Sequence, residues 1–184
     1  MTEPNTQASL QPAIVAPETR DLVVLAERLK DWLGSMIPAA QAITLADLRY
    51  PLGAGMSHET ILFDASWHEA GRQRHQGMVV RIKPSRHLVY QDDMFEAQYR
   101  LMQVMHESGK VPVARPLWFE ADPALLGAPF FAMEKVQGRV AVSYPPYAQS
   151  GWLVDASPAE RARLWQDAVT QLARIQQVQI GRAH

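Results

Sequence analysis

Apolar and polar residues alternate over residues 61–65 and again over residues 78–83, and this period of two predicts a pair of β-strands. In the second stretch the alternation places Val79 and Arg81 on one face of the sheet. The opposite face is apolar and is formed by Met78, Val80 and Ile82. The pattern therefore predicts a cation held within a largely apolar strand.

Two glycines, Gly53 and Gly55, interrupt the apolar region that precedes these strands, in the run L-G-A-G-M-S-H-E-T. Glycine lets the backbone turn tightly and approach a bound group closely. Successive amides in such a turn can form a concave site for an anion. A strand cation opposite a glycine turn suits a phosphate group, and the simpler alternative is a hairpin loop beside a surface arginine.

Three stretches repeat apolar residues at helical spacing, namely residues 19–36, residues 91–108 and the segment that follows Ser157. The last of these has a clear start signal, because Ser157 is followed by Pro158 and, three residues on, by Glu160. This is a capping box with proline at the first helical position. We therefore predict three helices, the last of them close to the end of the chain.

Three more apolar stretches predict strands over residues 43–50, 111–120 and 129–136, and the prolines of the second indicate an edge strand. The connections are expected to be a long hairpin loop over residues 66–76, a turn over residues 122–127 and an irregular linker over residues 140–151. Residues 1–17 are polar and without periodicity, so we expect a mobile tail.

The composition limits the possible functions. The 184 residues, 47% of them hydrophobic, suffice for one globular domain with a sizeable core. A formal net charge of −1 gives no general attraction to nucleic acid or to anionic membranes, and no stretch is long and apolar enough for a membrane span. There is no cysteine and no signal peptide, which fits a cytoplasmic protein. His68 and His75 lie in the expected loop without a ligand cluster, so no metal site is predicted.

These elements, in this order, resemble the N-terminal lobe of the protein-kinase-like fold and, within it, the aminoglycoside phosphotransferase family. The resemblance covers about residues 20–180 and is carried by the runs G-A-G-M-S-H-E-T-I-L-F, V-V-R-I-K-P, Q-Y-R-L-M, V-P-V-A-R-P-L, L-G-A-P-F-F-A-M-E-K-V-Q-G-R-V and L-A-R-I-Q-Q-V. It implies an α+β fold class. An antiparallel sheet of about five strands with a packed helix would occupy residues 18–138, and residues 139–184 would hold a linker and the first helix of a truncated C-lobe.

For the phosphate end of a bound nucleotide, the resemblance implies a loop formed by Gly53, Gly55 and Ser57. Arg81 would stand where kinases place the strand lysine that reaches the phosphates, and arginine can grip a phosphate with two parallel hydrogen bonds. In protein kinases a helix glutamate pairs with this strand cation. The matching position is Gln98, which can hydrogen-bond Arg81 but cannot neutralise it.

For the base, the resemblance implies that the segment after the strand at 129–136 acts as a hinge. The backbone carbonyl of Glu134 and the backbone amide of Val136 would pair with adenine, and Met133 would gate the pocket. The implied cofactors are ATP and magnesium.

The family takes its catalytic aspartate and its magnesium ligands from an H-G-D-x-x-x-x-N loop and a later aspartate, none of which this sequence contains. After Gly138 the chain has only Asp155 and Asp167, and neither is in a matching context. We therefore expect no catalytic or metal-ligating residue here, and the magnesium ligands would belong to the missing C-lobe. The chain alone is expected to be inactive, and the apolar face of its last helix is expected to favour self-association.

The resemblance implies an ATP-dependent phosphotransferase that acts on a hydroxyl group of a small molecule, with an antibiotic and a hydroxyacyl-CoA both open as acceptor. The alternative is a non-catalytic nucleotide-binding or protein-interaction module. A Rossmann enzyme is disfavoured because a strand, not a helix, follows the glycines. A P-loop is excluded because no G-K-[ST] sequence follows them.

Overall fold

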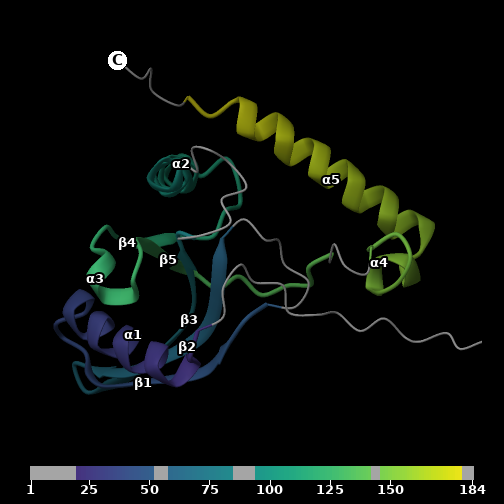
Figure 1. The fold of residues 1–184 in the computed structure, drawn as a ribbon. Coiled ribbons are helices and arrows are strands. Elements are labelled where there is room, and N and C mark those ends of the chain that lie inside the picture. The colour runs from purple at the N-terminus through teal and green to yellow at the C-terminus, as the bar shows by residue number, and fades with distance from the viewer. Residues whose placement is uncertain (1–19, 52–57, 85–93, 142–145, 180–184) are drawn as a thin grey trace, which may run out of the picture.

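A five-stranded antiparallel sheet with the strand order β1-β2-β3-β5-β4 forms the centre of the structure (Figure 1). The computed structural model describes residues 20–51, 58–84, 94–141 and 146–179. The strands are β1 (Gln41–Arg49), β2 (Glu59–Glu69), β3 (Arg72–Ile82), β4 (Pro116–Glu120) and β5 (Phe130–Glu134). The helices are α1 (Leu22–Met36), α2 (Phe95–Ser108), α3 (Pro123–Leu126), α4 (Trp152–Asp155) and α5 (Pro158–Gln176). The predicted α+β class and its five-stranded sheet are confirmed.

Helix α1 covers one face of the sheet and encloses the main core. Its buried side chains are Leu25, Leu29, Trp32 and Leu33. They pack on alternate residues of the central strands, including Ile61, Phe63, Met78, Val80, Ile82, Phe130 and Ala132. The predicted apolar face of residues 78–82 is therefore confirmed, and its period of two is what buries it against the helix.

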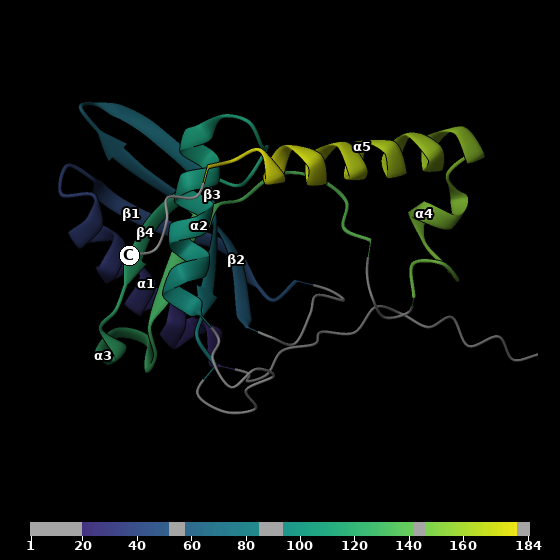
Figure 2. The same cartoon turned by 90° about the horizontal axis from the view of Figure 1, so that it is seen from above.

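Helix α2 lies on the opposite face, over β4 and β5 (Figures 1 and 2). Phe95 and Tyr99 of this helix form a smaller aromatic cluster with Phe131 and Phe119. On the same face of β2, Thr60, Leu62 and Asp64 are only half-buried, whereas the residues between them are fully buried. The second face is thus covered over β4 and β5 and left partly open over β2 and β3.

The long hairpin loop predicted for residues 66–76 is wrong, because β2 and β3 continue through it. Their residues pair in unbroken register as far as Glu69 and Arg72, with Ala70 and Gly71 as the turn. Both turn residues have positive φ, of 50° and 74°, as in the two-residue turns that suit the twist of a hairpin. Most of the polar residues that suggested a loop are exposed side chains of this hairpin, along which β1 pairs with β2 as far as His68.

Three other boundaries differ from the prediction. The edge strand at 111–120 is confirmed as an edge but is confined to β4, which begins only at Pro116. The turn at 122–127 contains the single-turn helix α3, capped by Asp122 and ended by Gly127 in the left-handed region. A second short helix, α4, follows the expected linker. The expected tail, residues 1–17, lies outside the described residues.

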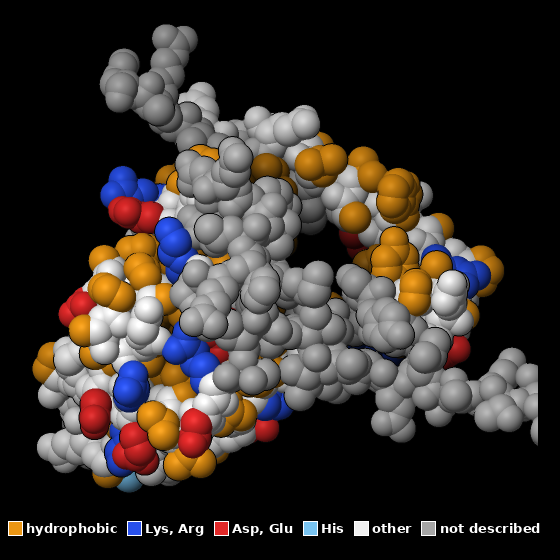
Figure 3. Space-filling model, viewed as in Figure 1, with side chains coloured by type: hydrophobic (Ala, Val, Ile, Leu, Met, Phe, Trp, Pro, Cys, Tyr) orange, Lys and Arg blue, Asp and Glu red, His pale blue; other side chains and the backbone are white. Residues whose placement is uncertain are grey.

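The predicted capping box of α5 is present, with reciprocal hydrogen bonds between Ser157 and Glu160. The helix extends away from the sheet in both ribbon views (Figures 1 and 2). Trp165 is 73% exposed and Leu172 is 57% exposed. Hydrophobic side chains gather along α5 on the face shown in Figure 3. The expected exposure of an apolar helix face is confirmed. None of the described helices is both long and apolar enough to cross a bilayer.

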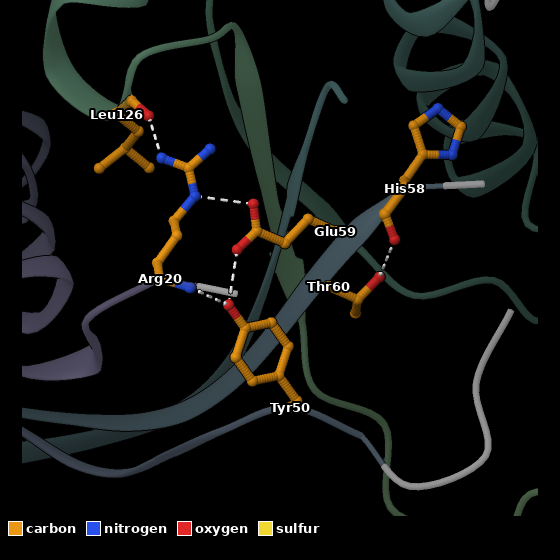
Figure 4. Close-up of polar contacts among 6 residues, drawn as sticks. All are labelled: Arg20, Tyr50, His58, Glu59, Thr60 and Leu126. Carbon is orange, nitrogen blue, oxygen red and sulfur yellow. Dashed lines mark hydrogen bonds and ion pairs between the residues drawn. The ribbon is translucent and has the colours of Figure 1, made fainter. Parts of the chain in front are cut away.

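A buried polar network ties the start of α1 to the start of β2 (Figure 4). The Glu59 carboxylate, only 2% exposed, accepts hydrogen bonds from Arg20 Nε at 2.7 Å and from the Tyr50 hydroxyl at 2.8 Å. Arg20 also donates its backbone amide to the Tyr50 hydroxyl at 2.9 Å and its guanidinium to the Leu126 carbonyl. A charge placed in the core is thereby paired and fully hydrogen-bonded.

We predict that Glu59→Gln lowers the free energy of unfolding by about 1–3 kcal/mol, because it leaves the Arg20 guanidinium without its anionic partner. Urea unfolding at neutral pH measures this effect. The matched control is Glu27→Gln, which breaks only the exposed pair with Lys30 and should change stability by less than about 0.5 kcal/mol. Equal effects of the two substitutions would contradict the role given to the network.

The same network predicts a stability change at alkaline pH. Burial, together with the hydrogen bond to Glu59, raises the pKa of Tyr50 from 10.0 to about 12. The folded state therefore holds this proton more tightly than the unfolded chain, and the associated stability is lost as pH rises from about 10 toward 12. Below about pH 10 we expect the wild type to exceed Tyr50→Phe in stability by a constant amount, and above it the difference should shrink. Urea unfolding of both proteins across this range tests it, and a constant or growing difference would contradict it.

Candidate functional site

The open part of the sheet presents three cross-strand rows of side chains from β2, β3 and β5, all on the face opposite α1. Strand pairing places Arg81 opposite Thr60 and Phe131, and Val79 opposite Leu62 and Met133. A third row pairs Gly77 with Asp64 of β2. Because neighbouring rows are two residues apart, they are separated by about 6.8 Å. A cationic row, an apolar row and an acidic row thus follow one another along the sheet.

Arg81 is the cation of the first row, and its surroundings favour an anionic ligand. Its Nη2 donates a hydrogen bond to His58 Nδ1 at 2.8 Å, and its guanidinium carbon lies 5.9 Å from the centre of the Phe131 ring. Burial lowers the pKa of Arg81 from its usual value. Within the described ranges, Arg81 Nε is buried without a hydrogen-bond partner and no carboxylate forms an ion pair with the side chain. A half-buried guanidinium in this state has hydrogen-bonding capacity left for an oxyanion.

His58 is a site residue that the sequence reasoning missed. It directly precedes β2, is 5% exposed and stacks 5.3 Å from the Phe95 ring. An arginine can only donate, so Nδ1 of His58 is the acceptor and is not protonated in this arrangement. Its ring points to the side of the sheet opposite the Glu59 network (Figure 4). The available signal was the period of two, which puts His58, Thr60 and Leu62 on one face.

Of the three residues predicted for the base, Met133 belongs to the apolar row, and the other two, in the hinge at residues 134–136, follow it along the chain. Met133 is opposite Val79 and packs on the aromatic cluster of α2. The Glu134 amide donates to the Arg115 carbonyl at 2.9 Å, at the point where β5 ends. Val136 follows two residues later and is 68% exposed. The structure therefore brings Met133 to the same sheet face as Arg81, whereas Glu134 pairs with Met78 and alternates to the α1 side.

Gln98 lies on α2 between Phe95 and Met102, at spacings of three and four residues, and so on the side of the helix that faces the sheet. The hydrogen bond of Arg81 in the described part of the chain goes to His58 rather than to the helix. Glu96, one position after Phe95, pairs with Arg100 on the helix surface. The predicted phosphate-loop residues Gly53, Gly55 and Ser57 lie outside the described residues.

The resemblance implies a magnesium ion, which needs a group of oxygen ligands close together. Among the described residues no group of three or more histidines, aspartates or glutamates lies close enough together to hold a metal ion. The donors present therefore do not fit a magnesium site.

A comparison of the sequence with known proteins identifies the family of the chain. A sequence model of the Phosphotransferase enzyme family matches residues 51–184, which is most of the chain and includes Arg81, Gln98 and the hinge. The chain belongs to the Phosphotransferase enzyme family. This confirms the resemblance on which the fold and site predictions depend.

Individual relatives of this family member are more distant. The chain is 29% identical over 105 residues to acyl-CoA dehydrogenase family member 11 of Rattus norvegicus, and 27% identical to the Homo sapiens protein of that name. Each match covers 57% of the chain and only 12% of the relative. A solved structure, a "putative aminoglycoside phosphotransferase" from Ralstonia eutropha JMP134, is 27% identical with a TM-score of 0.44, over 76% of the chain and 34% of the solved one. The chain thus spans a small part of the length of these proteins.

Proposed function

We propose that this chain provides the nucleotide-binding part of an ATP-dependent phosphotransferase that acts on a hydroxyl group of a small molecule. Membership of the Phosphotransferase enzyme family supports the reaction class. The single observation that carries the nucleotide site is Arg81, a half-buried side chain on the open sheet face whose buried Nε is unused and which has no carboxylate partner among the described residues.

The order of the rows along the sheet would determine which end of the nucleotide lies at Arg81 and which end lies at the hinge. Arg81 would hold phosphate oxygens, with His58 fixing the orientation of its guanidinium. One step of about 6.8 Å along β3 leads to the apolar row of Val79, Leu62 and Met133, where the flat face of adenine would lie. The hinge next to Met133 would supply backbone groups to the base edge. The cation would thus meet the phosphates, the apolar row the face of the base, and the hinge backbone the edge of the base.

ATP would supply the γ-phosphoryl group, and the residues described here would bind and orient it. Phosphoryl transfer also needs a residue that orients the acceptor hydroxyl and ligands for magnesium. The sequence has no H-G-D-x-x-x-x-N loop and the described residues offer no metal site. For this chain we therefore propose nucleotide binding without turnover.

The acceptor of the phosphotransferase stays open between two chemical classes. The names of the relatives refer to acyl-CoA dehydrogenases on one side and to an aminoglycoside phosphotransferase on the other. Either a hydroxyacyl-CoA or an antibiotic hydroxyl is compatible with a site built around Arg81, because this site contacts the nucleotide and not the acceptor.

A second candidate function is a nucleotide-binding or interaction module without catalysis. The exposed apolar side chains of α5, with Trp165 at 73%, favour it because such a surface is typical of a contact with another protein. The two functions share the nucleotide site and differ in what α5 contacts.

The Arg81 assignment predicts that Arg81→Gln weakens the binding of ATP about tenfold or more, because a charge-assisted hydrogen bond contributes about 1.5–3 kcal/mol. Calorimetric titration of ATP into the chain measures this. Arg74→Gln is the matched control, since Arg74 is on the same strand but projects to solvent and pairs with Glu69.

The expected result is saturable binding by the wild type and by Arg74→Gln, with a clear loss in Arg81→Gln. Absence of ATP binding by a folded wild-type chain would contradict the nucleotide site itself. Equal affinities of the wild type and Arg81→Gln would contradict the position of the phosphates.

A further inference from the structure

The third row of the open face contains an ion pair that crosses a strand. Lys135, the middle residue of the hinge, extends its side chain over Gly77 of β3, and its Nζ lies 2.6 Å from Asp64 Oδ1 on β2. The Lys135 backbone amide also donates to the Gly77 carbonyl at 2.9 Å. One residue thus attaches the hinge to two strands, by its backbone to β3 and by its ammonium group to β2.

Glycine at position 77 lets the lysine stem lie close to the backbone of β3. A Cβ atom built there would lie 2.8 Å from Lys135 Cε, 3.1 Å from Lys135 Cβ and 3.1 Å from Asp64 Oδ1. A side chain at this position would therefore require the Lys135 and Asp64 side chains to shift. The crossing gives a packing reason for a glycine in the interior of a long strand.

The lysine side chain is unusually well covered for its type. It is 8% exposed, whereas the Asp64 side chain is 46% exposed. Lysine is rarely buried unless it is paired, and here the aliphatic stem packs on the sheet while the ammonium group reaches a carboxylate at the edge of the covered region. This gives the side chain one defined position instead of many rotamers.

We propose that Lys135 is a positioning residue for the nucleobase, held by Asp64 across Gly77. It lies between Glu134 and Val136, the two residues whose backbone groups would meet the base edge. It also lies in the row that follows Val79, Leu62 and Met133, so the ion pair would bound the proposed base site on that side. This inference rests on the proposed function and adds to it the residues that fix the hinge.

The position of the ion pair predicts which ligands bind more weakly when the pair is lost. Loss of the pair loosens the hinge and this side of the proposed base site, which only the base would contact, and leaves the Arg81 row two steps away unchanged. Substitution should therefore weaken ATP and adenosine, and should not weaken inorganic tripolyphosphate, which has no base. A merely structural role would change all three ligands alike.

The test compares Lys135→Met, Asp64→Asn and the double variant with the wild type, by titration with ATP, adenosine and tripolyphosphate. Lys30→Met is the matched control, because Lys30 forms only an exposed pair on α1. We expect each single variant to bind ATP and adenosine about fivefold more weakly, with no further loss in the double variant because both changes remove one interaction. The affinity for tripolyphosphate should stay within about twofold of the wild-type value, because the variants leave Arg81 at the phosphate site unchanged.

Amide hydrogen exchange gives a readout that needs no nucleotide. The Lys135 amide, bonded to Gly77, should exchange faster in both single variants than in the wild type or Lys30→Met. Unchanged exchange and unchanged ATP affinity in the variants would overturn this inference alone. Equal losses for ATP and tripolyphosphate would overturn it too, by showing a general disturbance. A folded wild-type chain that binds none of the three ligands would overturn the proposed function together with the inference.

Discussion

The alternation of side chains along β2 and β3 is the constraint on which the remaining structure depends. Successive residues of a strand point to opposite faces, so a single run can serve a core and a site at once. Glu59 faces α1 and joins the network with Arg20 and Tyr50, while its neighbours His58 and Thr60 face the open side. A shift of one residue in this register would bury Arg81 against α1 and bring Val80 to the open face.

The two faces of the sheet are covered by different helices and to different extents, and this difference links the fold to the proposed function. Helix α1 covers one face with mainly apolar side chains, and the buried Glu59 network lies on the same face, so this face serves chiefly stability. Helix α2 covers the other face only over β4 and β5. Over β2 and β3 this face is only partly exposed, since Val79 is 8% exposed and Thr60, Leu62 and Asp64 are half-buried. A ligand placed there would gain both apolar and ionic contacts. The proposed nucleotide, apolar at one end and anionic at the other, would suit this division, and the chain belongs to the Phosphotransferase enzyme family.

The sequence predicted those parts that local patterns determine. The alternation at 78–82, the capping box at Ser157 and the edge position of the proline-containing strand are each fixed by a few neighbouring residues. The hairpin at 66–76 was missed because most of its side chains are polar and exposed, although Trp67 packs into the main core. The contacts of Arg81 with His58, and of Lys135 with Asp64, depend on strand register. Register is a property of pairing between segments, so it cannot be obtained from either segment alone.

The central claim is that one sheet face holds a nucleotide with its phosphates at Arg81 and its base at the hinge. Nuclear Overhauser contacts between ATP and the isotope-labelled chain test this most directly, with the Arg81 Nε–H resonance as a probe of the phosphate end. The account predicts contacts from the adenine protons to Val79 and Met133, and a shift of the Arg81 resonance as ATP is added. Contacts instead to the hollow between α2 and β4, which Lys83, Arg100 and Phe119 line, would contradict it.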